Sequence, residues 1–198
     1  MGLTWDCVDF KNGTITIEKQ MANMRFEHEA FQIIKKPKSQ KSIRTLHFSE
    51  TVKKELSQLK NLQSWDMQLL GEDYVYVETE TVDLKGKKVE RVVRKHMIED
   101  KSKELCLVCR KRNGGHIQSK TVEQFMKVLS KKVGFHCASH IGRHTHATLL
   151  LEEGANIANI SARLGHNGSD ITMQYLHSSK DADYDISNRI EKAILSTE

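Results

Sequence analysis

The sequence predicts an α+β fold that is mostly helical and has a small antiparallel sheet at one side. Two observations carry this prediction. In the first half of the chain, polar and apolar residues alternate with the period of two that is typical of strands. From Thr121 onward, apolar residues recur at helical spacing, and Gly154 and Gly165 stand where helices would end.

Length and composition indicate a single globular domain of 198 residues, with 38% hydrophobic and 29% charged residues. The net charge of +5 suits a polyanionic partner, although many solvated surfaces reach such values. No apolar run is long enough to cross a membrane, and the first ten residues lack the pattern of a signal peptide. Four unevenly spaced cysteines do not suggest a disulfide framework, so we expect a cytoplasmic protein.

Three short strands are expected before residue 50. They are residues 14–17, 30–34 and 42–48, in which alternation is clearest. The stretch 35–41 holds the one proline of the chain, Pro37. Because proline has no N–H to donate, this stretch is expected to be a strand end or a hairpin loop.

A helix and a charged hairpin are expected next. Ser49 is a candidate N-cap for a helix of about residues 50–62. Residues 73–95 alternate again on both sides of Lys85 and Gly86, which predicts a second hairpin.

The second half of the chain is predicted to be helical. Thr121 and Gln124 resemble a capping box at the start of its first helix. Further helices are expected at residues 140–153 and 156–164, from Ser169 or Asp170 onward, and at about 182–195.

Four side chains near the C-terminus point to phosphoryl transfer. Tyr175 follows His166 by nine residues and Arg143 by thirty-two, and His140 lies three residues before Arg143. A phenol can attack a phosphodiester and hold it as a phosphotyrosine. A guanidinium fits two phosphate oxygens, and imidazoles can donate hydrogen bonds or exchange protons. Taken singly, each residue would more often be structural, but their fixed spacing favours the functional interpretation.

Residues 139–177 read SHIGRHTHATLLLEEGANIANISARLGHNGSDITMQYLH. This stretch resembles the tyrosine recombinases, or phage-type integrases, whose pattern is His-x-x-Arg-His-Thr-His-Ala-Thr, then Leu-Gly-His, then Tyr. The resemblance implies that Tyr175 is the nucleophile and that Arg143 binds the scissile phosphate. It implies that His140 hydrogen-bonds the phosphate or exchanges a proton with the phenol, and that His166 donates to a phosphate oxygen.

The same resemblance implies site-specific recombination or integration of a mobile element. The chemistry would be a transesterification of double-stranded DNA that needs no metal, no cofactor and no ATP. It further implies self-assembly, as a tetramer on DNA, of the full-length parent. His144 and His146 match family positions that we expect to pack or to hydrogen-bond, and the role of His177 stays open.

A lysine completes the set that the resemblance implies. In the family, a lysine in a Pro-Lys-Thr or Ser-Lys-Thr hairpin gives a proton to the leaving 5′ oxygen, and Lys38 between Pro37 and Ser39 matches that context. Its rivals are Lys36 and Lys41, which are otherwise candidate DNA contacts together with Lys120.

The chain departs from the family pattern at three places. The family has a further arginine before a Leu-Thr-Trp segment. Here Gly2-Leu3-Thr4-Trp5 follows Met1 directly, so that arginine would lie upstream of residue 1, and we expect an N-terminally truncated catalytic domain. Residues 73–95 look like an inserted hairpin. Gly142 replaces a large apolar residue and should weaken its helix by about 1 kcal/mol relative to alanine.

Three other interpretations stay open. One is a type IB topoisomerase, which shares the chemistry but relaxes DNA. Another is a degenerate DNA-binding module without catalysis. The third concerns Cys106 and Cys109, a C-x-x-C pair that would need two more ligands, such as His116 and Cys137, to bind zinc; buried free thiols are the expected alternative.

Overall fold

The computed structural model describes residues 2–37, 39 and 42–165, with backbone alone for Ser139. Its residues fall into two compact units, Met1–Val128 and Leu129–Glu198. The two helices predicted beyond residue 166 lie outside the described residues. Among the helices of the described ranges, none is both long and apolar enough to span a membrane.

The first sheet is antiparallel and has the strand order β1-β2-β5. Its strands are β1 (Val8–Asp9), β2 (Thr14–Ile17) and β5 (Arg44–His47). Thr14 of the central strand pairs with Asp9 on one side and with His47 on the other. The strands predicted at residues 14–17 and 42–48 are thus confirmed, and they are neighbours in one sheet.

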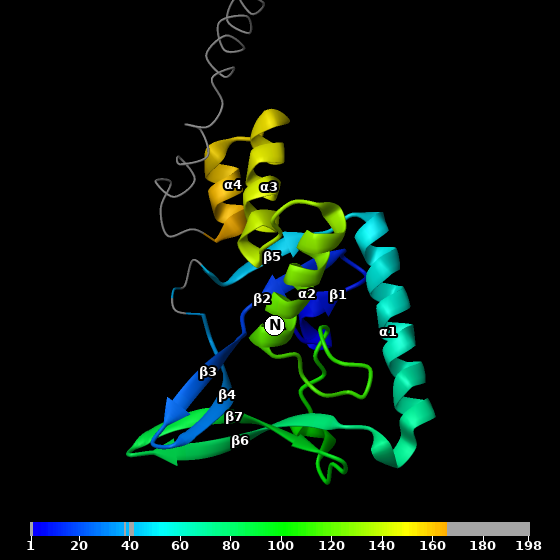
Figure 1. The fold of residues 1–198 in the computed structure, drawn as a ribbon, viewed down its shortest axis with the longest axis vertical. Coiled ribbons are helices and arrows are strands. Elements are labelled where there is room, and N and C mark those ends of the chain that lie inside the picture. The colour runs from blue at the N-terminus through cyan, green and yellow to red at the C-terminus, as the bar shows by residue number, and fades with distance from the viewer. Residues whose placement is uncertain (1, 38, 40–41, 166–198) are drawn as a thin grey trace, which may run out of the picture. The chain divides into compact units, whose positions relative to one another are not determined.

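The second sheet is also antiparallel, with the order β3-β4-β7-β6 (Figure 1). Its strands are β3 (Gln20–Phe26), β4 (Glu29–Lys35), β6 (Tyr76–Leu84) and β7 (Lys87–Lys95). The predicted hairpin turns at Lys85 and Gly86, whose φ angles are 56° and 87°. It does not stand alone, because β7 pairs with β4 at Ile33 and Ile34. Whether this hairpin is an insertion stays a prediction.

Strand β3 is absent from the sequence prediction. Its residues, Gln20–Phe26, contain no regular alternation of polar and apolar side chains, and pairing with β4 along its whole length makes it a strand. Gly2 lies against this strand, since a Cβ added there would be 2.8 Å from the backbone nitrogen of Met21.

The core of the first unit lies against the second sheet. Val77, Val92 and Leu107 are buried together, and Leu105 packs on them. The backbone N–H of Leu105 donates to the carbonyl of Val77 at 2.7 Å, which holds this segment at the sheet. Nearby, Gly114 has a φ of +90°, and a Cβ there would be 2.2 Å from the Val75 carbonyl oxygen, so only glycine fits.

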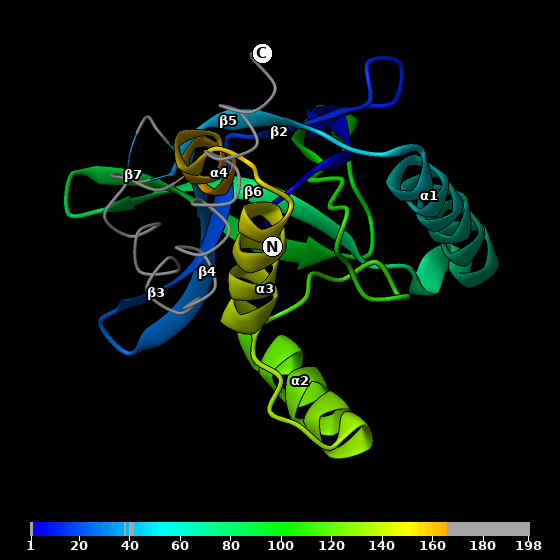
Figure 2. The same cartoon turned by 90° about the horizontal axis from the view of Figure 1, so that it is seen from above.

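Helix α1 (Glu50–Leu70) is longer than the predicted 50–62. Ser49 caps it as predicted, its hydroxyl accepting from the backbone N–H of Val52 at 3.4 Å. The helix continues until Gly71, whose φ of +51° ends it. Figures 1 and 2 both show the two hairpins of the second sheet extending away from α1.

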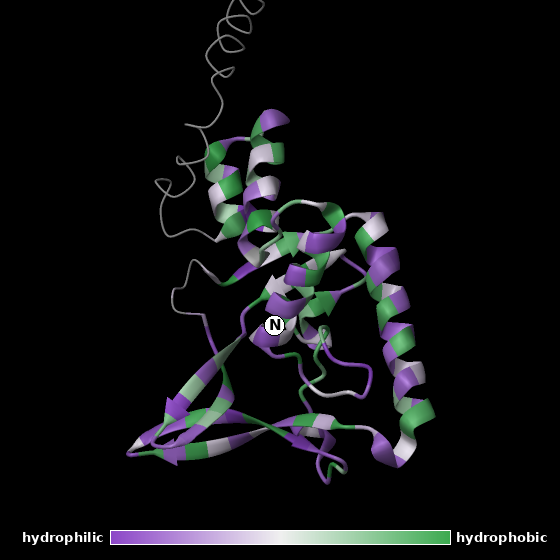
Figure 3. Ribbon diagram, viewed as in Figure 1, coloured by the Kyte–Doolittle hydropathy of each residue, from purple (hydrophilic) through white to green (hydrophobic). Residues whose placement is uncertain are grey.

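Polar contacts hold α1 to the rest of the first unit. Gln63 accepts from the indole Nε1 of Trp5 at 2.9 Å and donates to the carbonyl of Val108 at 2.8 Å. The Arg112 guanidinium pairs with Asp66 at 2.7 Å, and this hydrogen bond holds the pKa of Asp66 below its usual range. Figure 3 accordingly shows hydrophilic and hydrophobic residues intermixed along α1 rather than one continuous apolar face.

Three helices follow: α2 (Ser119–Val133), α3 (Ser139–Glu152) and α4 (Ile157–Leu164). The predicted capping box at Thr121 is wrong, because α2 begins two residues earlier. Helices α3 and α4 match the predicted ranges to within one residue at each end. Asn156 caps α4 by accepting from the N–H of Ala158 at 2.7 Å, and Gly165 ends it with a φ of +70°.

The second unit has a small core of its own. Ala147 of α3 is buried against Ile160 and Leu164 of α4, and Leu150 and Leu151 cover this cluster. The chain turns between the two helices at Gly154, whose φ is +78°. This packing therefore holds α4, including its last residue Leu164, against Ala147 in the middle of α3.

Replacing Gly142 with alanine should stabilise the second unit. Gly142 lies inside α3, and a Cβ there meets nothing within 4 Å, so the substitution adds helix propensity without a clash. We expect the free energy of unfolding to rise by about 1 kcal/mol, measured as a higher midpoint in urea.

Gly134 provides the matched control. A Cβ at Gly134 also meets nothing within 4 Å, but the φ there is +80°, so alanine should destabilise by about 1 kcal/mol. A Gly142→Ala midpoint that falls like that of Gly134→Ala would show that glycine is required inside α3.

Candidate active site

Helix α3 presents two of the predicted site residues. His140 and Arg143 are three residues apart on α3, so they share one helical face, and both are exposed. The first turn of the helix is closed by the N–H of Ile141, which donates to the Ala138 carbonyl at 3.0 Å. The helix confirms the prediction that His140 and Arg143 lie on one helical face.

Arg143 also contacts the end of α4. Its Nη2 donates a hydrogen bond to the carbonyl oxygen of Leu164. The last carbonyls of a helix carry partial negative charge, which favours a cation at this position. At the same place Gly165 donates its N–H to the Ala162 and Ser161 carbonyls and ends the helix. The guanidinium is thereby held at the residue that precedes Gly165 and His166 in the sequence.

This contact leaves most of the guanidinium available. A guanidinium has five N–H donors, and the Leu164 carbonyl takes one of them. A surface arginine often forms an ion pair with a nearby carboxylate instead. In the described ranges none of the ion pairs involves Arg143, so no carboxylate there competes with a phosphate for it.

A second side-chain contact links the same two helices. Arg163 of α4 donates from Nε to Nε2 of His146 on α3 at 3.2 Å. This contact confirms that His146 hydrogen-bonds within the fold, as its position predicted. His144 is exposed on α3, and its carbonyl accepts from the Thr148 hydroxyl at 3.2 Å.

The other predicted site residues divide into two groups. Lys36, just after β4, and Lys120, in the first turn of α2, are both exposed in the first unit. The remainder, Lys38, Lys41, His166 and Tyr175, lie outside the described residues.

The cysteines differ from expectation in one respect. All four are free thiols, and Cys7 is buried, but Cys109 is exposed and Cys106 is half-buried. The expectation of two buried thiols is therefore wrong for Cys109. An isolated antiparallel bridge joins Thr4 to Leu107 in this segment. In the part of the chain that the structure describes, no three metal-ligating side chains come together.

Two curated proteins illustrate the similarity of this chain to known sequences. Transposase A from transposon Tn554 of Staphylococcus aureus is 28% identical over 149 residues, which is 68% of this chain and 40% of that protein. Tyrosine recombinase XerC of Bacillus licheniformis is 37% identical over 84 residues, which is 41% of this chain and 28% of that protein. The chain therefore spans less than half the length of these relatives.

Two solved structures have a similar fold. The Tn1549 transposon integrase in complex with transposon right end DNA gives a TM-score of 0.66 at 18% identity, over 96% of this chain and 53% of that one. The crystal structure of XerA recombinase gives 0.56 at 18% identity, over 95% of this chain and 50% of that one. These similarities confirm the predicted α+β fold.

The likeness to a known family extends along most of the chain. A model of the phage integrase family matches residues 1–182, which include both sheets and all four helices α1–α4. The resemblance read from residues 139–177 is thereby confirmed, and the chain belongs to the phage integrase family.

Proposed function

We propose that the full-length protein is a site-specific DNA recombinase of a mobile element that works through a 3′-phosphotyrosine intermediate. One observation carries the proposal most directly: Arg143 is exposed, free of carboxylate partners in the described ranges, and fixed at the end of α4. A guanidinium held in this way is prepared to bind two non-bridging phosphate oxygens.

The proposed reaction exchanges one ester for another. The phenol oxygen of Tyr175 attacks the phosphorus, its proton passes to a neighbouring base such as His140, and the bond to the 5′ oxygen breaks. Lys38 gives that oxygen a proton, so a free 5′ hydroxyl leaves. Attack by a 5′ hydroxyl of a partner duplex reverses the step and joins the strands. Bond energy is conserved, and neither a cofactor nor ATP is consumed.

Catalysis is proposed to be mainly electrostatic. Arg143 and the ring N–H groups of His140 and His166 would offset the charge that develops on the phosphoryl oxygens. Removing one such donor from an enzyme typically costs about 3 kcal/mol of transition-state stabilisation. The geometry of α3 supports this assignment, because it places His140 and Arg143 on one face.

Among the other tyrosines, Tyr74 is poorly suited to be the nucleophile. It is 1% exposed, and burial raises the pKa of its phenol to about 12. A buried phenol cannot reach the phosphate of a duplex, and its raised pKa makes the attacking phenolate harder to form. Tyr76 is packed edge-to-face against Tyr74, with ring centroids 4.9 Å apart. These observations support the assignment of Tyr175.

Double-stranded DNA is the proposed partner, and a tetramer on DNA is the proposed assembly. The net charge of +5 supports binding to phosphates, with Lys36, Lys41 and Lys120 as proposed contacts. The Tn1549 integrase, whose fold is similar, was solved in complex with DNA. Action on DNA also supports a cytoplasmic location.

Residues 1–198 alone are proposed to cleave DNA slowly. The family resemblance implies a second phosphate-binding arginine before the Leu3-Thr4-Trp5 segment, and residues 1–198 do not supply it there. If the natural protein also lacks it, the chain is a DNA-binding module without catalysis, which is the second candidate function.

Replacing Tyr175 with phenylalanine in the full-length protein should abolish the covalent adduct and leave DNA binding unchanged. The substitution removes only the attacking oxygen. The measurement is trapping on a nicked suicide duplex, with denaturing electrophoresis for the adduct and anisotropy for binding. Tyr74→Phe is the matched control and should still form the adduct. An adduct that persists in Tyr175→Phe would sink the assignment.

Extending residues 1–198 at the N-terminus with a segment that carries an arginine before Leu3 should speed cleavage of a suicide duplex by a factor of about 10² to 10³, because one transition-state donor is added. Single-turnover rates of the short and extended chains provide the comparison. Equal, robust cleavage by both would mean that an arginine within residues 1–198, such as Arg25 or Arg44, completes the site. Cleavage by neither would favour the DNA-binding module.

A further inference from the structure

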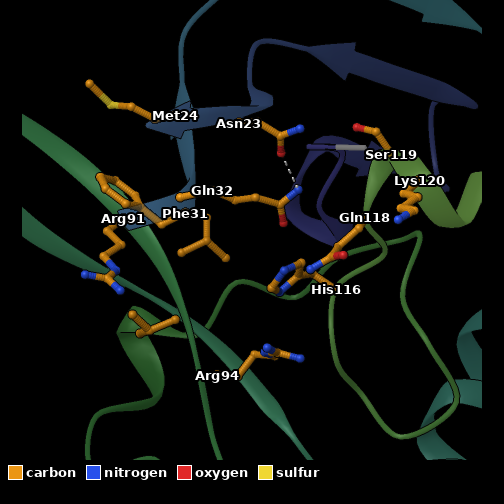
Figure 4. A pocket seen from close by; sticks show the side chains of 13 residues that line it. Asn23, Met24, Phe31, Gln32, Arg91, Arg94, His116, Gln118, Ser119 and Lys120 are labelled. Atoms are coloured by element: carbon orange, nitrogen blue, oxygen red, sulfur yellow. Dashed lines mark hydrogen bonds between the residues drawn. The ribbon is translucent and has the colours of Figure 1, made fainter. Parts of the chain in front are cut away.

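The first unit holds a pocket of about 570 Å³ beside strands β3, β4 and β7 and the first turn of α2. Figure 4 shows Gln32 and His116 in its wall, with Gln32 donating to Asn23. Phe31 also lines it, but consecutive residues of a strand point to opposite faces of the sheet, so Phe31 and Gln32 do not converge on one ligand. The contacts that bear on the candidate active site lie between α3 and α4.

Two polar links join α3 to the last two residues of α4. Arg143 of α3 donates to the carbonyl oxygen of Leu164. Arg163 of α4 donates from Nε to Nε2 of His146, at 3.2 Å. His146 follows Arg143 by three residues, so the two lie on one face of α3, one turn apart. The links therefore run in opposite directions between the same two stretches of helix.

The end of α4 depends on contacts from outside the helix. With eight residues, α4 is shorter than helices that are stable alone in water, and the last carbonyls of a helix have no partner further along it. The N–H of Gly165 serves the carbonyls of Ser161 and Ala162, whereas the Leu164 carbonyl accepts from Arg143. A shift of this last turn would therefore move the acceptor and the guanidinium together.

The apolar contacts of the second unit do not fix this turn by themselves. Leu164 packs against Ala147, but hydrophobic contacts have no direction, so they leave the orientation of the carbonyl open. The bond from Arg163 to His146 is directional, because a hydrogen bond weakens steeply when it bends. Since Arg163 directly precedes Leu164, this bond restrains the turn that carries the acceptor.

The chemistry of the bond defines the part that His146 plays. A guanidinium N–H can only donate, so Nε2 of His146 is the acceptor, and the neutral ring carries its proton on Nδ1. Both side chains are half-buried, which shields the bond from water. The charge of Arg163 would suit the end of a helix even without a partner, whereas a neutral acceptor at His146 is specific to this bond.

We propose that His146 and Arg163 form a clasp that positions Arg143 for cleavage. This inference rests on the proposed recombinase function. The clasp holds the last turn of α4, the Leu164 carbonyl holds the Arg143 guanidinium, and the guanidinium meets the scissile phosphate already ordered. His146 and Arg163 are thus positioning residues, which act through Arg143 and do not touch the reacting atoms.

The first test is NMR relaxation of the 198-residue chain, which needs no cleavage. His146→Phe keeps a flat ring and removes the acceptor, so the ¹⁵N order parameter of the Arg143 Nε–H should fall below about 0.6, the range of flexible groups. In His146→Gln it should stay as in the unchanged chain, because Oε1 of glutamine can accept in place of Nε2. The matched control is His144→Phe, on another face of α3, which should leave Arg143 ordered.

The second test is single-turnover cleavage of a suicide duplex by the full-length protein. His146→Phe should slow cleavage by about 10- to 100-fold, because a slightly misplaced catalytic group is costly. DNA affinity and the urea midpoint should stay close to those of the unchanged protein, and His146→Gln should restore most of the rate. Added to Arg143→Lys, His146→Phe should slow cleavage by less than about threefold, because no guanidinium remains for the clasp to position.

Three results would overturn the clasp. They are an Arg143 that stays ordered in His146→Phe, a His146→Gln that behaves like His146→Phe, and costs of His146→Phe and Arg143→Lys that multiply in the double variant. If the unchanged full-length protein cleaves no DNA, the recombinase function fails, while loss of Arg143 order in His146→Phe would still support the clasp. Should His146→Phe not fold, Arg163→Met removes the same bond from the side of α4 and takes its place in both tests.

Discussion

The hydrogen bond from Arg143 to the Leu164 carbonyl is the constraint on which the candidate active site depends. It joins the exposed face of α3 to the last turn of α4. The buried contacts of Ala147 with Ile160 and Leu164 pack the same two helices together. An arginine on a solvated helix would otherwise have many rotamers, and ordering it on a phosphate would cost free energy. Here the fold has ordered it in advance.

The first unit shows a different use of polar groups. Gln63 and Asp66 are buried, and each has a partner that fixes α1. Gln32 and His116 are equally buried, but an atom of each is left without a partner among the described residues. The former are structural, because satisfied buried groups specify one packing.

Local rules predicted a large part of this structure. Alternation identified β2, β4, β5 and the β6–β7 hairpin, and the positive φ at Gly154 and Gly165 agrees with the expected helix ends. The prediction from sequence failed at one strand, which depends on its pairing partner, and at the end of one helix. Gln20–Phe26 becomes a strand only beside β4, and α1 runs on to Gly71 because nothing before it breaks the helix.

The candidate site divides in the same way. Spacing along one helix was enough to place His140 and Arg143 on a common face. The Arg143 contact with a backbone carbonyl has no sequence signal, since any residue at position 164 offers the same oxygen. The pocket lined by Gln32 and His116 was missed too, because its residues come from three strands, the segment before α2 and the first turn of α2, which are distant in sequence.

The most direct test of the account is single-turnover cleavage of a suicide duplex by the full-length protein carrying Arg143→Lys. Lysine keeps the charge, but its ammonium cannot hold the Leu164 carbonyl and grip two phosphate oxygens in one plane. The account predicts that DNA affinity changes by less than about tenfold while cleavage slows by a factor of about 10² to 10³. Cleavage within about tenfold of the unchanged protein would contradict it, because charge alone would then suffice and the anchored guanidinium would have no role.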